Sequence, residues 1–337
     1  MQLQETGIFP PGLQRIAAMT MSPERLSAGS SAPLPANAFG GNALAAAAMI
    51  TWSAGFPAAE VLLQTWPPVM LLAARLVLAA TGILLLWAMR EGVQTVLRAP
   101  WRKGLMIGFF GFGASAYLII QAQVLTNAVT AALICSAAPV IGGVIEMLQG
   151  QRRLGVRFAL GAAATVTGGI IATSSLSGAE LGLGAAAAAV AITLYTWASS
   201  ASVRALPDLS PAGRSSVTIC GGLLLASVMT AGTALLGGEW LPRAPVSGYQ
   251  LQMLLIFGLV SVMLSQLLWL SSVDRLGVAL ASFHTNLAPF YVMILMLFLG
   301  ESWEWPQAIG AAVVGLGVVV AQDRRPKLAE PMGGSRA

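Results

Sequence analysis

Residues 101–151, WRKGLMIGFFGFGASAYLIIQAQVLTNAVTAALICSAAPVIGGVIEMLQGQ, decide the fold, because residues 251–301 match them without a gap at a constant offset of 150 positions. The matched pairs include Gly108 with Gly258, Ser115 with Ser265, Ala138-Pro139 with Ala288-Pro289, and Gly150 with Gly300. Identity across the window is sparse, so the match gains its weight from the membrane topology described next. The offset predicts an internal duplication.

The composition is that of an integral membrane protein. Of the 337 residues 56% are hydrophobic and 9% are charged, whereas about a quarter of a soluble chain is charged. Since a span needs roughly 20 apolar residues, we predict ten spans near 40–58, 67–89, 103–122, 127–148, 155–175, 181–203, 216–237, 249–272, 277–299 and 305–322. Five spans per copy force the second copy to enter from the opposite side. The prediction is an all-α membrane protein with ten transmembrane helices in two inverted five-helix repeats, an arrangement typical of alternating-access transporters.

The positive charges agree with this topology. With the N-terminus in the cytoplasm, all 18 Lys and Arg residues except Arg75 and Arg243 fall on the inner side or at inner span ends, as the positive-inside rule requires. Both termini are therefore expected in the cytoplasm. The net charge of +5 then reflects topology, and no nucleic-acid partner is expected.

The rest of the chain adds short tails and no catalytic motif. We expect residues 1–36 to be a disordered cytoplasmic tail, 37–175 the first repeat, 181–322 the second, inverted repeat, and 323–337 a C-terminal tail. Cys135 and Cys220 lie within spans without metal-ligand spacing. Since a phosphate-binding loop, a nucleophile triad and a metal cluster are all missing from the sequence, we expect neither an enzyme nor a cofactor.

Two prolines and two glycine-rich spans have structural consequences. Pro139 and Pro289 lack the amide proton that the fourth and ninth helices need, so both helices should kink. Paired kinks in two repeats indicate a central site or a bending element, although a static packing kink remains the alternative. The glycines of the fifth and tenth spans allow close helix packing, within one chain or in a homodimer.

Several motifs together resemble a known family. The first span ends in ITWSAGF (50–56), the second begins with Pro67-Pro68 and continues through AARLVLA (73–79), and the ninth ends in LGE (299–301). With the Ala-Pro pairs, these resemble the EamA-type transporters of the drug/metabolite transporter superfamily over residues 40–322. The resemblance implies ten spans in two inverted repeats around a cavity. One departure is visible, since Gln151 stands in the first repeat where Glu301 stands in the second.

The resemblance and the helical spacing nominate candidate substrate-binding side chains. His284, the sole histidine, shares a helix face with Tyr291 and lies near Asn286 in the ninth span; a satisfied core histidine is the alternative. The family lines its cavity with the first, third, fourth, sixth, eighth and ninth spans. Stripes there add Trp52, Tyr117, Tyr195, Gln266 and Trp269, although such stripes also serve packing.

Arg75 is a cation deep within the second span. An arginine at mid-membrane costs about 2.5–3.5 kcal/mol, which carbonyls, water or an anionic substrate group must offset. The family's arginine at this position favours a structural or gating role. The predicted spans hold no Asp or Glu at mid-membrane, which disfavours an acidic proton relay, although the histidine side chain of His284 keeps proton coupling open.

These observations predict a carrier of small organic metabolites in a bacterial inner membrane. Within the resemblance, outward transport of amino acids, including aromatic ones, fits the weakly polar, aromatic candidates best. Two alternatives remain: efflux of drugs or cationic compounds, and a membrane scaffold that transports nothing. The expected partners are a small-molecule substrate and the lipid bilayer, and a homodimer is left open.

Overall fold

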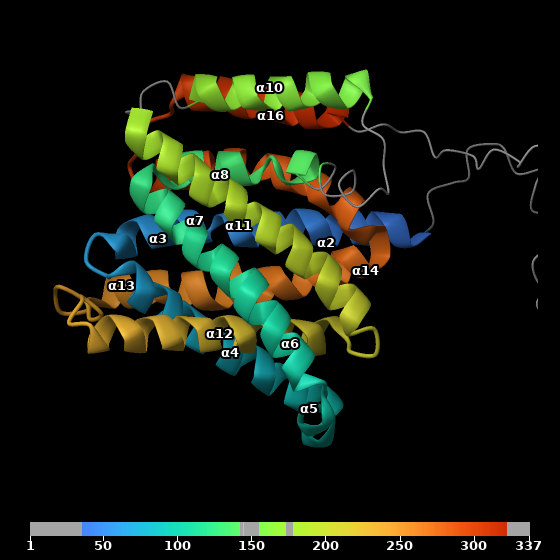
Figure 1. The fold of residues 1–337 in the computed structure, drawn as a ribbon, viewed down its shortest axis with the longest axis vertical. Coiled ribbons are helices and arrows are strands. Elements are labelled where there is room, and N and C mark those ends of the chain that lie inside the picture. The colour runs from blue at the N-terminus through green and yellow to red at the C-terminus, as the bar shows by residue number, and fades with distance from the viewer. Residues whose placement is uncertain (1–35, 142–143, 145–154, 173–177, 322–337) are drawn as a thin grey trace, which may run out of the picture. The chain divides into compact units, whose positions relative to one another are not determined.

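A computed structural model describes residues 36–141, 144, 155–172 and 178–321, which form helices and no strand. The predicted tails, 1–36 and 323–337, lie almost entirely outside this range. The elements follow in chain order (Figure 1): α2 (Ala36–Ser53), α3 (Gly55–Leu63), α4 (Pro68–Glu91), α5 (Val93–Arg98), α6 (Trp101–Ile107), η2 (Gly108–Gly113), α7 (Ala114–Leu125), α8 (Ala128–Cys135), α10 (Val156–Ala172), α11 (Gly178–Ala205), α12 (Pro211–Leu235), α13 (Gly248–Leu255), η3 (Ile256–Leu264), α14 (Ser265–Ala281), η4 (Ser282–Leu287), α15 (Ala288–Phe298) and α16 (Trp305–Ala321).

Many of these helices are suited to a membrane. Six continuous helical segments are long and apolar enough to span it: Phe39–Leu63, Pro68–Glu91, Trp101–Leu125, Gly182–Ala205, Pro211–Leu235 and Gly248–Gly277. Four shorter apolar segments accompany them, at Ala128–Ile141, Val156–Ala172, Ser282–Phe298 and Trp305–Val320. The chain is thus a multi-pass, all-helical membrane protein. The count of ten spans and the inversion of the repeats stay predictions.

The first span extends further than its sequence prediction. Its helix continues through α3 to Leu63 instead of ending near residue 58. Pro57 does not stop it, because proline is tolerated in the first turn of a helix and α3 starts two residues earlier. Glu60 therefore lies on a helix within the span. It lies about one turn from the end of that span, at Leu63, so it does not contradict the expectation of no Asp or Glu at mid-membrane.

Both proline-containing helices are interrupted one turn before the proline. α8 ends at Cys135, and a turn separates it from the short helix that contains Pro139. In the second half the 3-10 helix η4 precedes α15, whose first turn contains Pro289. These breaks agree with the loss of a helical hydrogen bond at proline. Whether they bend during function stays a prediction.

Two π-helices lie at matching places in the halves of the chain. η2 spans Gly108–Gly113, and an offset of 150 positions places it within η3, Ile256–Leu264. Such segments use a wider hydrogen-bond turn than an α-helix and are often found near functional sites. η2 packs closely on α12, where a Cβ atom on Gly221 would lie 2.8 Å from Cα of Gly108.

α10 and α16 form a pair along the upper edge in Figure 1. A Cβ atom on Gly168 would lie 2.6 Å from the carbonyl oxygen of Gly310, and one on Gly317 would lie 2.7 Å from that of Gly161. The two backbones therefore touch without intervening side chains, as small residues allow in lipid. The predicted role of these glycines in packing within the chain is confirmed.

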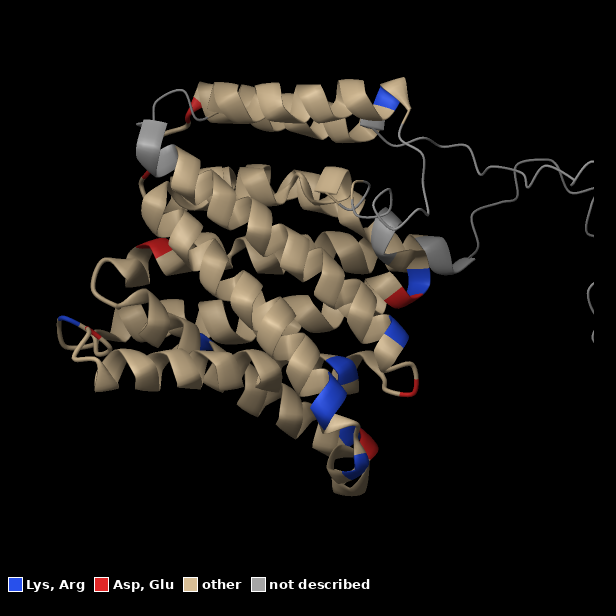
Figure 2. Ribbon diagram, in the orientation of Figure 1, with Lys and Arg blue, Asp and Glu red and all other residues tan. Residues whose placement is uncertain are grey.

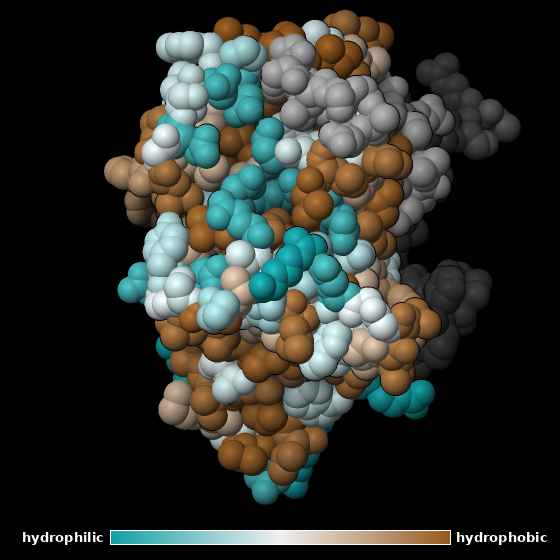
Figure 3. Space-filling model, turned by 90° about the vertical axis from the view of Figure 1, so that its left-hand side faces the viewer, coloured by the Kyte–Doolittle hydropathy of each residue, from teal (hydrophilic) through white to brown (hydrophobic). Residues whose placement is uncertain are grey.

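Charged residues lie mainly at the two ends of the helices (Figure 2). Most described Lys and Arg residues gather at the right-hand ends in that view. The opposite ends face the viewer in Figure 3, where hydrophilic residues gather across the middle of the face. The segments between the ends are almost free of charge, which is the pattern expected of spans.

Candidate functional site

A cavity of about 80 Å³ is lined by residues from both halves of the chain. α2, α3, α4, η2 and α7 contribute from the first half, and α11, α12, η3 and α14 from the second. Since a buried water needs about 10–15 Å³ of such space, the cavity has room for several waters or for part of a small organic molecule. Its position between the halves makes it the candidate substrate site.

Aromatic rings form much of the cavity wall. Trp52 and Phe56 meet edge to face with their ring centres 5.0 Å apart, and Phe112 meets Tyr195 at 5.2 Å in the same manner. Trp269 is 2% exposed and packs on Tyr195 at 6.0 Å without lining the cavity. Edge-to-face pairs are favourable and fix ring orientation, so the wall is held in place before any ligand enters.

The hydroxyl and indole groups near the wall tie neighbouring helices together. The Trp269 indole N–H donates to Ser199 Oγ at 3.2 Å, joining α14 to α11. Ser261 Oγ donates to the carbonyl oxygen of Trp52 at 3.0 Å, joining η3 to α2. Gly55 lies against Ser261, and any side chain at this position would overlap the Ser261 hydroxyl. Glycine here keeps η3 close to the first span.

Gln123 is a cavity residue that sequence analysis missed. Its side-chain amide nitrogen donates to the Phe56 carbonyl oxygen at 2.8 Å and to Glu60 Oε2 at 2.7 Å. These bonds join α7 to α3 and give the Glu60 carboxylate a partner within the span. Gln123 lies just past the predicted third span, 103–122, so its polarity gave no signal for a site within the membrane.

Among the candidate substrate-binding side chains, Trp52, Tyr195 and Gln266 line the cavity, and Arg75 lines it as well. The Tyr195 hydroxyl donates to Gln266 Oε1 at 3.4 Å. Arg75 is 7% exposed, and its guanidinium carbon lies 4.4 Å from the centre of the Phe257 ring. The structure thus brings together candidates from four different helices.

The other candidates do not line this cavity. His284 is partly buried in η4, with Nδ1 3.3 Å from the carbonyl oxygen of Ala281. Asn286 is buried nearby, and its Oδ1 has no hydrogen-bond partner. Tyr291 packs against the buried hydrophobic cluster that contains Trp269. Tyr117 packs among apolar residues around α4. Their binding roles stay predictions, as do the gating roles of Pro139 and Pro289, because these residues do not line the cavity.

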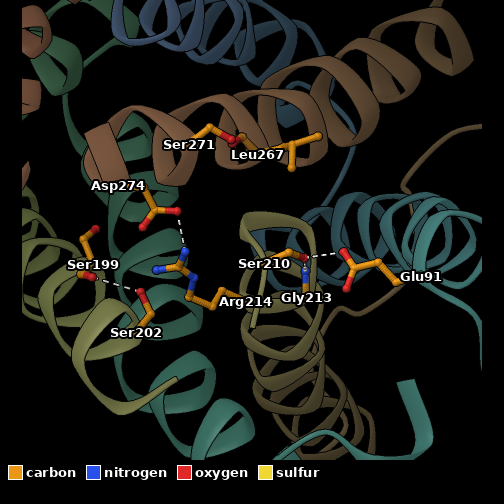
Figure 4. A network of polar contacts seen from close by, with 9 residues as sticks. All are labelled: Glu91, Ser199, Ser202, Ser210, Gly213, Arg214, Leu267, Ser271 and Asp274. Carbon is orange, nitrogen blue, oxygen red and sulfur yellow. Dashed lines mark hydrogen bonds and ion pairs between the residues drawn. The ribbon is translucent and has the colours of Figure 1, made fainter. Parts of the chain in front are cut away.

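A polar network joins helix ends near α12 (Figure 4). Arg214, 6% exposed in its side chain, pairs with Asp274 of α14. Ser210 caps α12 by accepting from the Gly213 N–H at 3.1 Å and donates to Glu91 of α4 at 2.5 Å. The network ties α12 to both neighbouring helices, away from the cavity lining.

The described residues offer no group of three His, Cys, Asp or Glu side chains placed to hold a metal ion. The cavity chemistry is instead that of a small-molecule site, with an apolar wall and a few polar groups. Ser115, Ser261, Ser265, Gln123, Gln266 and Arg75 supply those groups.

Comparison with known proteins identifies relatives in sequence and in fold. The model of the EamA-like transporter family matches the chain twice, over residues 39–174 and 181–321. A solved structure titled "Crystal structure of protein" superposes with a TM-score of 0.64 at 20% identity, covering 84% of this chain and 97% of the other. At this identity the likeness concerns the fold alone. A search of curated proteins gives no match.

Proposed function

Because the chain belongs to the EamA-like transporter family, whose members carry small molecules, we propose that it moves amino acids, aromatic ones among them, outward across a bacterial inner membrane by alternating access. The observation that supports this proposal is the cavity between the halves. Trp52, Phe112 and Tyr195 supply aromatic surface, and Gln123 and Gln266 supply hydrogen-bonding groups. A mostly apolar cavity with few polar groups suits a small organic molecule.

The charge of the lining argues against the alternative of cationic-compound efflux. Arg75 lines the cavity, and the lining residues include no Asp or Glu. The Glu60 carboxylate is bound to Gln123 and does not belong to the lining. A cation in this cavity would therefore meet a like charge and lack a counter-charge, which disfavours its binding.

Counterflow in proteoliposomes tests the proposal. Vesicles preloaded with unlabelled phenylalanine should accumulate radiolabelled phenylalanine, and Trp52→Ala should lower the initial rate roughly 2- to 10-fold, because an aromatic contact contributes about 0.5–1.5 kcal/mol. Trp240→Ala is the matched control, since Trp240 is 40% exposed and lies in the loop between α12 and α13. Absence of flux of every amino acid by a folded, monodisperse protein would favour a scaffold. Flux of organic cations alone would favour drug efflux.

A further inference from the structure

Three residues that line the cavity each have a buried polar side-chain atom without a hydrogen-bond partner. These atoms are Arg75 Nε on α4, Ser115 Oγ on α7 and Gln266 Nε2 on α14. The three side chains are 7%, 0% and 6% exposed. Buried polar groups are nearly always hydrogen-bonded, so three unpartnered groups around one cavity indicate a ligand or ordered water that completes them.

The hydrogen-bonding chemistry of these three groups indicates which class of ligand would fit them. A guanidinium N–H and an amide N–H can only donate, and a serine hydroxyl donates readily. The Gln266 oxygen accepts from the Tyr195 hydroxyl, and its amide nitrogen is the unpartnered atom. The cavity therefore presents a set of donors, one of them cationic, and it needs an anionic acceptor with several lone pairs. A carboxylate has two oxygens and pairs well with a guanidinium fork.

The groups packed against Arg75 supply no acceptor and no negative charge for its guanidinium. The guanidinium is stacked on the Phe257 ring at 4.4 Å, which is a favourable contact but satisfies no N–H group. The Glu60 carboxylate accepts from the lining residue Gln123 and does not itself line the cavity. The described part of the chain thus offers Arg75 no ion pair, and a buried cation without one is costly.

We propose that Arg75, Gln266 and Ser115 form a carboxylate-binding site in the cavity, and that the transporter recognises its substrates by the carboxylate and not by the ammonium group. The proposal rests on the proposed function and narrows its substrate class. Because the lining residues hold no Asp or Glu, an ammonium group gains no counter-charge there. Aryl or alkyl carboxylates that lack an amine should therefore be accepted alongside amino acids, and amines and amides of the same size should be rejected.

Four phenyl compounds of similar size test this recognition: phenylalanine, 3-phenylpropionate, phenylalaninamide and phenethylamine. Each is added to the purified protein for thermal stabilisation and then used in counterflow. The two carboxylates should bind at least about tenfold more tightly than the amide and the amine, since a hydrogen bond to a charged group contributes about 1.5–3 kcal/mol. Equal binding or transport of all four would overturn the carboxylate site while leaving transport intact. If the protein neither binds nor moves any of them, the proposed function fails together with the inference.

Substitutions of Arg75 and Gln266 test whether these residues determine the preference for carboxylates. Arg75→Gln should reduce carboxylate affinity about 10- to 100-fold and abolish the preference over the amide, whereas Arg243→Gln, at an exposed surface pair with Glu239, should change neither. If the role of Arg75 were purely structural, Arg75→Gln would lower stability and leave the ratio of carboxylate affinity to amide affinity unchanged. Should Arg75→Gln fail to fold, Gln266→Leu carries the test, with Gln252→Leu at an exposed position as its control. If Gln266→Leu kept the wild-type ratio of carboxylate affinity to amide affinity, the proposed site would be refuted.

Discussion

Replacing Gly310 by alanine should weaken the contact between α10 and α16. The added methyl carbon would lie 2.5 Å from the carbonyl oxygen of Gly168 and 2.5 Å from Cβ of Ala172. Both atoms are fixed to the facing backbone, so no change of side-chain rotamer relieves the overlap and the helices must move apart. Inserting a methyl group into a well-packed core typically costs about 1–3 kcal/mol.

Gly315→Ala provides the control on the same helix. A Cβ atom on Gly315 would have no heavy atom within 4 Å. Alanine favours a helix over glycine by about 0.8–1.0 kcal/mol in water, and both variants share this gain because both sites lie within α16. The difference in unfolding free energy between the two variants therefore isolates the packing cost, and Gly310→Ala should be the less stable by about 1–3 kcal/mol.

Thermal unfolding in one detergent, followed by circular dichroism and tryptophan fluorescence, measures this difference. The neighbouring glycines of α10 repeat the comparison on the facing helix: Gly168→Ala should be destabilising, because its Cβ would lie 2.6 Å from the Gly310 carbonyl oxygen, whereas Gly169 has open space. If Gly310→Ala melted at or above Gly315→Ala, the conclusion that the backbones touch would be wrong.

Two further predictions concern polar side chains. Gln123→Leu should lower the unfolding free energy by about 1–3 kcal/mol, because it removes the side-chain donor to Glu60, which then keeps only its backbone hydrogen bond with Ala128. Gln252→Leu should have little effect, and equal melting temperatures would contradict the prediction. Asp274→Asn should also destabilise by leaving the buried Arg214 unpaired. The cost should stay below the roughly 3–5 kcal/mol lost by a fully buried pair, since the Asp274 side chain keeps 29% exposure. An unchanged melting temperature would refute this pairing.

The fold class could be predicted from the sequence because its strongest signals are compositional. Long apolar segments, the sites of the basic residues and the 150-residue offset specified a multi-pass helical chain with two related halves. Span ends were less predictable. The first helix runs past residue 58 to Leu63, because Pro57 falls in the first turn of α3, where proline is tolerated, and Glu60 also fits within the helix.

The site was only partly predictable for a physical reason. Trp52, Tyr195, Gln266 and Arg75 stood out as polar or aromatic groups at helical spacing, and they line the cavity. Phe257 also lines the cavity but did not stand out in the sequence, because a membrane helix is apolar on the sides that face lipid as well as on those that face protein. An apolar residue in such a helix therefore carries no signal about its direction.

His284 shows the opposite difficulty. Its polarity marked it for the cavity, yet polarity does not reveal which neighbouring helix a side chain faces. In the structure it lies on η4, with its ring nitrogen Nδ1 near the carbonyl oxygen of Ala281 at the end of α14. The interruption before Pro289 changes the helix type there, so a register extrapolated from an unbroken α-helix no longer applies.

The two π-helices have one consequence in both halves of the chain. Their hydrogen bonds run from residue i to residue i+5, so the backbone turns less per residue there than in an α-helix. Both occupy the same place in the two stretches that match the family. Ser115 of α7 and Ser265 of α14 follow η2 and η3 within two residues, and both line the cavity. The wider turn in each half therefore helps to set the direction of a polar side chain at the candidate site.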